Sequence, residues 1–414
     1  MKNTPLLPFV LITSLFLMWG LANNMTDTLL SAFKRIQSMT DAQTSLIQVA
    51  FYGAYFCLAL PAAILIKKFT YKTGVLVGLG LFIAGSLLFY PASKTMVYGH
   101  FLAALYILAG GLSILETTAN PYIIAMGPME TATRRLNLAQ SFNPIGSITG
   151  VVLSKIFILS HLNIASAEER AAMDAGQLSA IQSEELSAVM GPYVGVAVVL
   201  AVLWLVIAVI RMPRASDEDR VLDFSATVQR LLRRRRYVWG VVAQFFYVGA
   251  QICVWSFTIR YVMQELKVNE DQAASYYLAA LVLFTLSRFV FTWLMKYVRP
   301  GTLLGVSALL AMLFTLITIL GNGIVGVVAL VAISGFMSLM FPTIFGLASV
   351  GLGQDAKLGG SGLIMAILGG AVLTALQGWV SDSTGNIHLS YLVPLACFAV
   401  VACFGFFVST GERA

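Results

Sequence analysis

Apolar runs of 18 or more residues recur along the whole chain, and this pattern excludes most folds. A helix needs about 20 apolar residues to cross a bilayer. Lipid cannot satisfy backbone polar groups, so only helices and closed barrels span membranes. Barrel strands are segments of about ten residues with alternating polarity, which these runs are not. Charged residues make up only 11% of the chain, against about 25% in soluble domains. The sequence therefore predicts an all-α integral membrane protein.

Twelve apolar segments have the length of a transmembrane helix. They lie at about 8–33, 43–66, 73–91, 98–126, 136–160, 189–211, 237–264, 272–297, 302–320, 324–350, 359–381 and 389–409. An even number of spans places both termini on the same side. Of the 26 basic residues, 18 lie in the loops and ends on that side, which predicts that it is cytoplasmic. The net charge of +7 thus reflects topology, and we expect no nucleic-acid partner.

The chain is predicted to divide into a six-helix bundle at 1–211, a cytoplasmic linker at 212–236 and a second six-helix bundle at 237–414. The two bundles share a weak sequence repeat: Arg134-Arg135 followed by Gly146 in the first matches Lys357-Leu358 followed by Gly369 in the second. This layout is typical of secondary transporters, whose substrate site lies near the midplane between the repeats.

Two segments outside the spans carry their own predictions. In the linker, one helical face ahead of the basic run 233–236 carries Val221, Phe224, Val228 and Leu231. This favours either an amphipathic helix on the membrane surface or a solvated linker that sets topology. The stretch 162–188 reads as an outer extension of helices.

Glu116 is a carboxylate inside an apolar run. A charge near the bilayer centre costs about 2.5–3.5 kcal/mol on insertion scales, so such a residue normally faces protein or a water-filled path. Ser113, Glu116 and Asn120 share one helical face, and Pro121 weakens the backbone beside them. We expect this face to be functional.

Polar residues also form stripes at helical spacing in other spans. They are Gly20, Asn23 or Asn24, and Asp27 in the first span; Asn137, Gln140, Asn143 and Ser147 in the fifth; Gln244, Tyr247, Gln251, Trp255 and Thr258 in the seventh; and Arg288 in the eighth. A single buried amide can simply join helices, at about 0.6 kcal/mol each. Stripes on four helices favour a shared cavity. Amides match sugar hydroxyls, and a flat aromatic ring covers the apolar face of a pyranose.

Asp27 and Glu116 are the candidate proton carriers, because a carboxyl group shielded from water can exchange a proton near neutral pH. By helical rise they differ in depth by about 13 Å, which fits two stations on one path. An ion pair of either carboxylate with Arg288 is the structural alternative. Arg288 itself is either a hydrogen-bond donor to the sugar or a structural clamp.

Motifs for other chemistry are missing from the sequence. It has no Walker A loop, nucleophile elbow or metal-ligand cluster, and we predict no enzyme activity, cofactor or metal. The four cysteines lie in apolar runs without CxxC spacing and are expected to be small core residues.

Five strings carry a resemblance to the fucose permease branch of the major facilitator superfamily, whose members are fucose–galactose–hexose proton symporters. They are Ala22-Asn-Asn-Met-Thr-Asp27, Leu115-Glu-Thr-Thr-Ala-Asn-Pro-Tyr122, Arg135-Leu-Asn-Leu-Ala-Gln-Ser-Phe-Asn143, Tyr247-Val-Gly-Ala-Gln251 and Pro342-Thr-Ile-Phe345. The resemblance implies the two-bundle facilitator fold, alternating access and symport of a sugar with a proton.

The resemblance also implies residue roles. It makes Asp27 and Glu116 the protonatable pair, and it implies sugar contacts at Asn24, Gln140 and Asn143 and on the tenth span. The full set of expected substrate-binding residues is Asn24, Asn120, Gln140, Asn143, Gln251, Arg288 and Phe341.

Two positions depart from the family pattern. The family has Gln-Tyr before the Pro-Thr-Ile-Phe string, where this chain has Met340-Phe341, and this leaves the preferred sugar open. The aspartate usual in the loop after the second span is absent from 63–74, so the contact that locks the inner gate is unknown.

We therefore predict a monomeric proton-coupled importer of a neutral monosaccharide, such as L-fucose, galactose or a related hexose, in the bacterial inner membrane. One alternative is a sodium-coupled glucose/galactose transporter. Another is a membrane receptor that binds a sugar without transporting it.

Overall fold

The computed structural model describes residues 5–36, 41–95, 97–157, 173–213 and 223–411, and secondary structure in these ranges is helical throughout. Within these ranges, the side chains of 26–36, 41–46, 48, 93, 155, 175, 179, 186–190, 271 and 411 lie outside the description. The first set of helices comprises α1 (Leu6–Ile36), α2 (Asp41–Lys68), α3 (Tyr71–Thr95), α4 (Tyr98–Ala125), α5 (Ala132–Gln140), α6 (Phe142–Phe157) and α8 (Ala175–Val209).

The second set begins after the short linker helix α9 (Phe224–Arg233). It comprises α10 (Arg235–Leu266), α11 (Glu270–Leu294), α12 (Pro300–Leu320), α13 (Gly323–Met337), α14 (Met340–Ser349), α15 (Ala356–Met365), α16 (Gly369–Thr384), α17 (Ile387–Ser390) and α18 (Leu392–Gly411). Three 3-10 turns, η1 (Met129–Thr131), η3 (Gly353–Asp355) and η4 (Ala366–Leu368), complete the chain order.

Within the described ranges, 11 helices are long and apolar enough to cross a membrane. The span predicted at 136–160 is not among these 11. Its described part consists of α5, which ends at Gln140, and α6, which runs from Phe142 to Phe157, and 158–160 lie outside the described residues. The helical membrane fold predicted from the apolar runs is confirmed.

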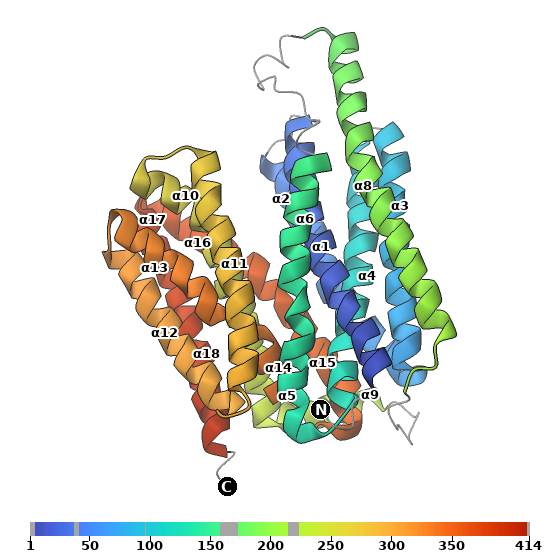
Figure 1. Ribbon diagram of the computed structural model, residues 1–414, viewed down its shortest axis with the longest axis vertical. Helices are drawn as coiled ribbons and strands as arrows, with labels where there is room; N and C mark the ends of the chain where they lie inside the picture. The colour runs from blue at the N-terminus through green and yellow to red at the C-terminus, as the bar shows by residue number, and fades with distance from the viewer. Residues whose placement is uncertain (1–4, 37–40, 96, 158–172, 214–222, 412–414) are drawn as a thin grey trace.

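Helix α8 begins well before its predicted span at 189–211. Asp174 caps it by accepting hydrogen bonds from the backbone N–H groups of Gly176 and Gln177 at 2.8 and 2.9 Å. The apolar part begins only at Gly191, so about 24 Å of helix precedes it. This part projects beyond the neighbouring helices at the top of Figure 1. The predicted extension is thus helical from Ala175, while 158–172 lies outside the description.

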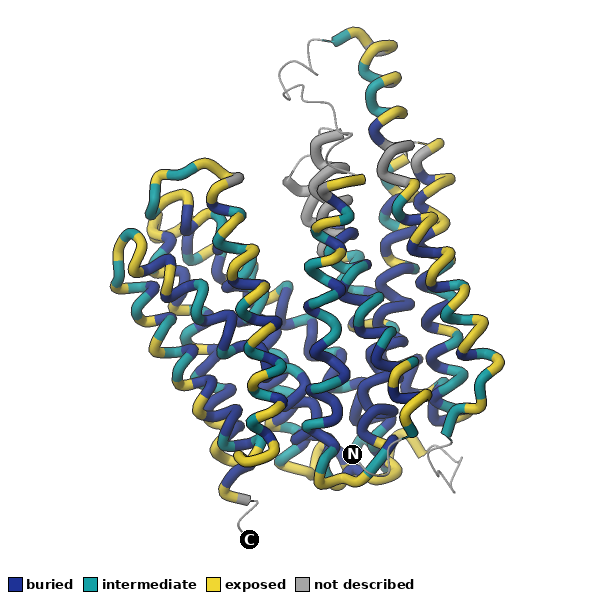
Figure 2. The backbone as a smooth tube through the Cα atoms, in the orientation of Figure 1, coloured by how far each residue is buried: buried dark blue, intermediate teal, exposed yellow. Residues whose placement is uncertain are grey.

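The two sets stand side by side and approach each other most closely at the bottom of Figure 1, where α1 begins and α18 ends. We call this side the terminal side. Contacts across it join α15 to α2 and α4, and α14 to α5. Figure 2 shows the buried residues concentrated where helices face one another, with exposed residues along the outer surfaces. Exposed Leu205, Val209 and Leu286 suit contact with lipid.

In each set of helices, a glycine of one helix packs directly against the backbone of another, at corresponding positions. A Cβ added at Gly146 of α6 would lie 1.9 Å from the carbonyl oxygen of Leu17 in α1. One added at Gly369 of α16 would lie 2.0 Å from the carbonyl oxygen of Phe245 in α10. Only glycine permits such an approach. These are the two glycines at matching positions of the weak sequence repeat. The domain boundaries at 1–211, 212–236 and 237–414 stay a prediction.

The linker helix α9 packs on the protein. Thr227 and Leu231 are buried, whereas Phe224 and Leu232 are exposed. Arg230 forms a two-pronged ion pair with Asp355 of η3, with Nη2 2.7 Å from Oδ1 and Nε 3.0 Å from Oδ2. A helix is therefore present at 224–233, and one of its faces covers the terminal side of the second set. The predicted contribution of Val221 lies outside the described residues.

Candidate functional site

A cavity of about 230 Å³ lies between the two sets of helices. Its first wall comes from α1, α2, α4, α5 and α6, and its second from α10, α11, α14 and η4. The lining residues are Trp19, Asn23, Asn24, Phe51, Tyr52, Tyr55, Glu116, Gln140, Asn143, Pro144 and Ser147 on the first wall, and Val248, Gln251, Ile252, Trp255, Tyr277, Leu281, Phe284, Arg288, Phe341 and Ile367 on the second.

The two walls differ in chemistry. Besides Gln140 and the carboxyl group of Glu116, the first wall carries three asparagines, one serine and two tyrosines, which are Asn23, Asn24, Asn143, Ser147, Tyr52 and Tyr55. The second is mainly aliphatic and aromatic, and Gln251 and Arg288 are its strongly polar members. A pyranose has a ring edge bearing hydroxyls and an apolar face of C–H groups. The cavity can therefore offer amides to the hydroxyls and aromatic rings to the C–H face.

Most of the predicted substrate-binding residues line this cavity: Asn24, Gln140, Asn143, Gln251, Arg288 and Phe341. Asn120 does not, because it is fully buried behind Gln140. Its Oδ1 accepts a hydrogen bond of 2.7 Å from Gln140 Nε2, so it can orient the Gln140 amide. Met340 is also fully buried, which leaves Phe341 as the residue of the Met340-Phe341 pair that faces the cavity. The roles of all these residues stay predictions.

Glu116 lies on the cavity wall but is only 4% exposed. Its Oε2 is buried without a hydrogen-bond partner among the described residues. On the same face, Ser113 Oγ donates to the carbonyl oxygen of Tyr55 at 3.0 Å, which fixes α4 against α2. An ionised carboxylate without partners is costly in such a place, so the geometry favours a group that carries a proton part of the time. Asp27 is in α1, but its side chain lies outside the described residues.

Arg288 is buried at the cavity, 4% exposed. Its Nη1 donates to the carbonyl oxygen of Gln140 at 2.9 Å, and its Nε donates to that of Ser338. The guanidinium carbon lies 4.6 Å from the centre of the Phe284 ring. No ion pair joins Arg288 to Glu116, both of which the structure describes. The alternative in which Glu116 is paired with Arg288 is therefore wrong.

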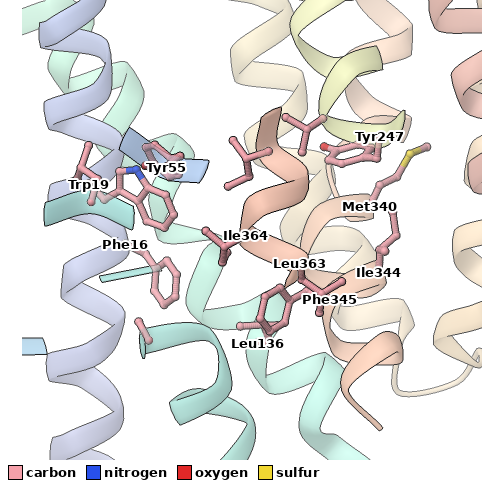
Figure 3. Packing of buried hydrophobic residues seen from close by; sticks show 14 of the residues in the cluster. Phe16, Trp19, Tyr55, Leu136, Tyr247, Met340, Ile344, Phe345, Leu363 and Ile364 are labelled. Carbon is pink, nitrogen blue, oxygen red and sulfur yellow. The ribbon is translucent and has the colours of Figure 1, made fainter. Parts of the chain in front are cut away.

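The sequence-based prediction did not include several aromatic residues of the cavity wall, chiefly Trp19, Phe51, Tyr52 and Tyr55. Trp19 precedes Asn23 by four residues and so belongs to the same stripe. Phe51 and Tyr55 are also four residues apart, with ring centroids 5.3 Å apart. Figure 3 shows Trp19 beside Tyr55, and Tyr247 on the opposite side of the view. Trp19 could have been predicted to face the cavity, because it lies one helical turn from Asn23 in the polar stripe.

Comparisons with known proteins identify the family and the fold. Residues 9–366 match the family model described as Major Facilitator Superfamily. The chain is 41% identical to the L-fucose-proton symporter of Escherichia coli, covering 98% of this chain and 93% of that protein. It is 35% identical to the glucose/galactose transporter of Brucella abortus, covering 95% and 92%. The crystal structure of the facilitator FucP in its outward conformation superposes with a TM-score of 0.91 at 41% identity, covering 97% of this chain and 98% of that one.

Proposed function

The chain belongs to the major facilitator superfamily, and we propose that it imports a neutral monosaccharide together with a proton. It is a multi-pass membrane transporter of the sugar–proton symport type, and L-fucose is the first candidate for its substrate. The relatives that carry this function match over nearly their full length. Alternating access moves the substrate, because the cavity lies between two sets of helices that can rock against each other.

One observation supports this proposal above the others: the carboxyl group of Glu116, whose Oε2 has no hydrogen-bond partner among the described residues, lies on the wall of a cavity that offers both amides and aromatic rings. The amide wall of Asn24, Gln140 and Asn143 binds the sugar hydroxyls. Gln251 adds an amide from the second wall. The rings of Trp255 and Phe341 lie against the apolar face of the sugar. In this arrangement Glu116 senses sugar occupancy directly.

The proton is carried by two carboxyl groups in turn. In the cycle we propose, Asp27 loads a proton on the outer side while the sugar binds, and the two sets of helices then rock. Glu116 links the occupied site to proton release on the inner side. The terminal side is cytoplasmic, as the distribution of basic loop residues predicts. The transporter works as a monomer in a bacterial inner membrane, surrounded by lipid.

Uptake into proteoliposomes with an imposed pH gradient tests the proposal. We expect L-fucose to accumulate, and the accumulation to collapse when a protonophore is added. Asp27→Asn should abolish accumulation but retain counterflow, because exchange of sugar for sugar needs no net proton movement. Accumulation by Asp27→Asn would remove Asp27 from the coupling path. Exchange of sodium for potassium at fixed pH serves as the control, since a sodium-coupled carrier would lose uptake.

The glucose/galactose transporter relative supports galactose as the competing substrate. D-Galactose carries a hydroxyl group on C6, whereas C6 of L-fucose is a methyl group, and the two sugars belong to opposite configurational series. A second wall rich in apolar side chains favours the methyl group, and competition between the two sugars measures that preference. If neither sugar competes and neither accumulates, the substrate belongs to another class.

A further inference from the structure

Two prolines lie in the first turns of helices that follow a break in the chain, one in each set of helices. Pro144 lies in α6, and Pro342 lies in α14. A proline has no N–H group, so the carbonyl group four residues before it loses its usual helical donor. For Pro144 that carbonyl belongs to Gln140, the last residue of α5. For Pro342 it belongs to Ser338, just after α13.

Arg288 supplies donors to both of these carbonyl groups. Its Nη1 donates to Gln140 and its Nε to Ser338. The donors of a guanidinium are held in a fixed, planar fork, so one side chain can serve two acceptors at a set distance. Lysine offers its donors from a single nitrogen on a flexible stem, so it could not match two acceptors that are held at the spacing of Nη1 and Nε.

The two carbonyl groups belong to different sets of helices. Arg288 and Ser338 are in the second set, and Gln140 is in the first, so the hydrogen bond to Gln140 crosses the interface. Beside it, the rings of Phe142 and Phe289 meet edge to face at 6.1 Å. Asn137 Nδ2 donates to Thr343 Oγ1 at 3.1 Å, one turn closer to the terminal side on α5. Arg288 therefore lies between the cavity and the closed contacts of the terminal side.

We propose that Arg288 couples sugar binding to opening of the terminal side. In the empty transporter it joins α5 to α11 and the α13–α14 break, and so keeps the two sets together beneath the cavity. Arg288 and Gln140 both line the cavity. A sugar hydroxyl that reaches this point takes over the Nη1 donor and releases the Gln140 carbonyl. Because a ligand shifts a conformational equilibrium only through its differential contacts, this exchange gives the sugar a direct means of opening the terminal side.

This coupling rests on the proposed sugar transport, and the test keeps the two separate. The reporter is Ser349→Cys in a protein whose four natural cysteines are replaced. Ser349 is 5% exposed and lies one turn beyond Gly346, where an added Cβ would come within 2.8 Å of Thr133 Oγ1. Because it lies three residues after Gly346, on the same face of α14, we expect its side chain to become accessible when α14 separates from α5. The rate of alkylation by a bulky polar maleimide is measured on purified protein with and without L-fucose.

In the parent protein, sugar should accelerate alkylation. Arg288→Lys should raise the sugar-free rate about tenfold, a usual size for coupling between sites, and should remove the acceleration by sugar. Alkylation of Arg288→Lys at the parent rate, or an undiminished response to sugar, would overturn the proposal. Arg260→Lys is the matched control, since Arg260 is an exposed arginine of α10 that lies 5.1 Å from the Phe257 ring. It should change neither rate.

Tryptophan fluorescence, which reports on Trp19 and Trp255 in the cavity wall, measures sugar binding separately. If the parent protein binds no sugar, the proposed function fails, while the sugar-free rates still test whether Arg288 holds the terminal side closed.

Pro144→Ala tests the origin of the contact and covers the case in which Arg288→Lys does not fold. It restores a backbone N–H that can donate to Gln140, which weakens the need for Arg288. We expect alkylation without sugar to be faster than in the parent protein. The double variant should raise that rate by less than the product of the two separate fold-changes. Independent effects would contradict this role.

Discussion

The ammonium group of Lys357 lies 4.9 Å from the centre of the Tyr71 ring, and this contact joins α15 of the second set to α3 of the first. Lys357 is only 5% exposed. Tyr71 stacks on Tyr122 at 4.9 Å, with the two rings 12° apart, and the Tyr122 hydroxyl donates to the carbonyl oxygen of Pro213 at 2.8 Å. A cation on a tyrosine pair thus occupies the region where the family's loop aspartate is missing.

Lys357→Met should loosen the terminal side. A cation–π contact contributes about 0.5–2 kcal/mol, with the larger values at desolvated sites, so the ratio of open to closed forms should rise about 2- to 30-fold. Alkylation of a cysteine at Ser361, which is 2% exposed, measures the change. Lys68→Met is the control, because Lys68 lies 5.8 Å from the ring of its own neighbour Phe69 and does not link the two sets. Equal rates in the two variants would exclude the Lys357 contact as a lock.

Glu116→Gln should impair concentrative uptake by at least about tenfold, while the amount of protein in the membrane stays within about twofold. The amide has nearly the same shape as the carboxyl group but cannot exchange a proton, and general acid–base groups act through that exchange. Uptake in proteoliposomes with a pH gradient measures the effect. Glu130→Gln is the control, since Glu130 is exposed in η1, outside the cavity. Normal uptake kinetics in Glu116→Gln would exclude its coupling role.

Gly146→Ala should lower the thermal stability of the purified protein. The new Cβ would lie 1.9 Å from the Leu17 carbonyl oxygen, so α1 and α6 must separate, and overpacking of this kind costs about 1–3 kcal/mol. Gly53→Ala is the matched change, because nothing lies within 4 Å of a Cβ at that position. We expect it to be neutral or slightly stabilising. A thermal shift assay in detergent compares the two, and equal melting temperatures would refute the close contact.

Phe341→Tyr, which restores the tyrosine of the family pattern at this position, should change the preference between galactose and L-fucose. The variant adds a hydroxyl to the apolar wall, and one new hydrogen bond contributes about 0.5–1.5 kcal/mol, or about 2- to 13-fold in the ratio of the KM values for galactose and L-fucose. Phe246→Tyr is the control, because Phe246 does not line the cavity. An unchanged ratio would mean that Phe341 does not contact the part of the sugar around C6.

Apolar runs and polar stripes predicted much of this architecture. Span lengths follow from the thickness of a bilayer, and a stripe such as Asn137, Gln140 and Asn143 follows from helical periodicity. The break at Ser141 was not expected, although Pro144 was visible in the sequence. A proline shows that a donor is missing but not whether the helix continues, and that depends on which tertiary groups satisfy the freed carbonyl.

The position of Arg288 was predictable, but its partners were not. Its acceptors are main-chain carbonyl groups of residues 50 and 148 positions away, and a carbonyl has no side-chain identity to read from sequence. Lys357 and Tyr71 are likewise distant in the chain and of unlike types. The tertiary fold decides such contacts, whereas Glu116 could be recognised locally because a carboxylate in an apolar helix is costly wherever it points.

The contacts of Gly146 and Gly369 bear on how this molecule could be inhibited. Each presses one helix directly on the backbone of another, so each set of helices has little freedom to deform internally, and transport must come from movement between the sets. A molecule that fills the cavity and is too thick to let the sets change their angle would act as a wedge. A sugar bearing a rigid aryl group, directed at the aromatic second wall, would therefore arrest the transporter by its bulk, even if its hydroxyl groups bound no more tightly than those of the substrate.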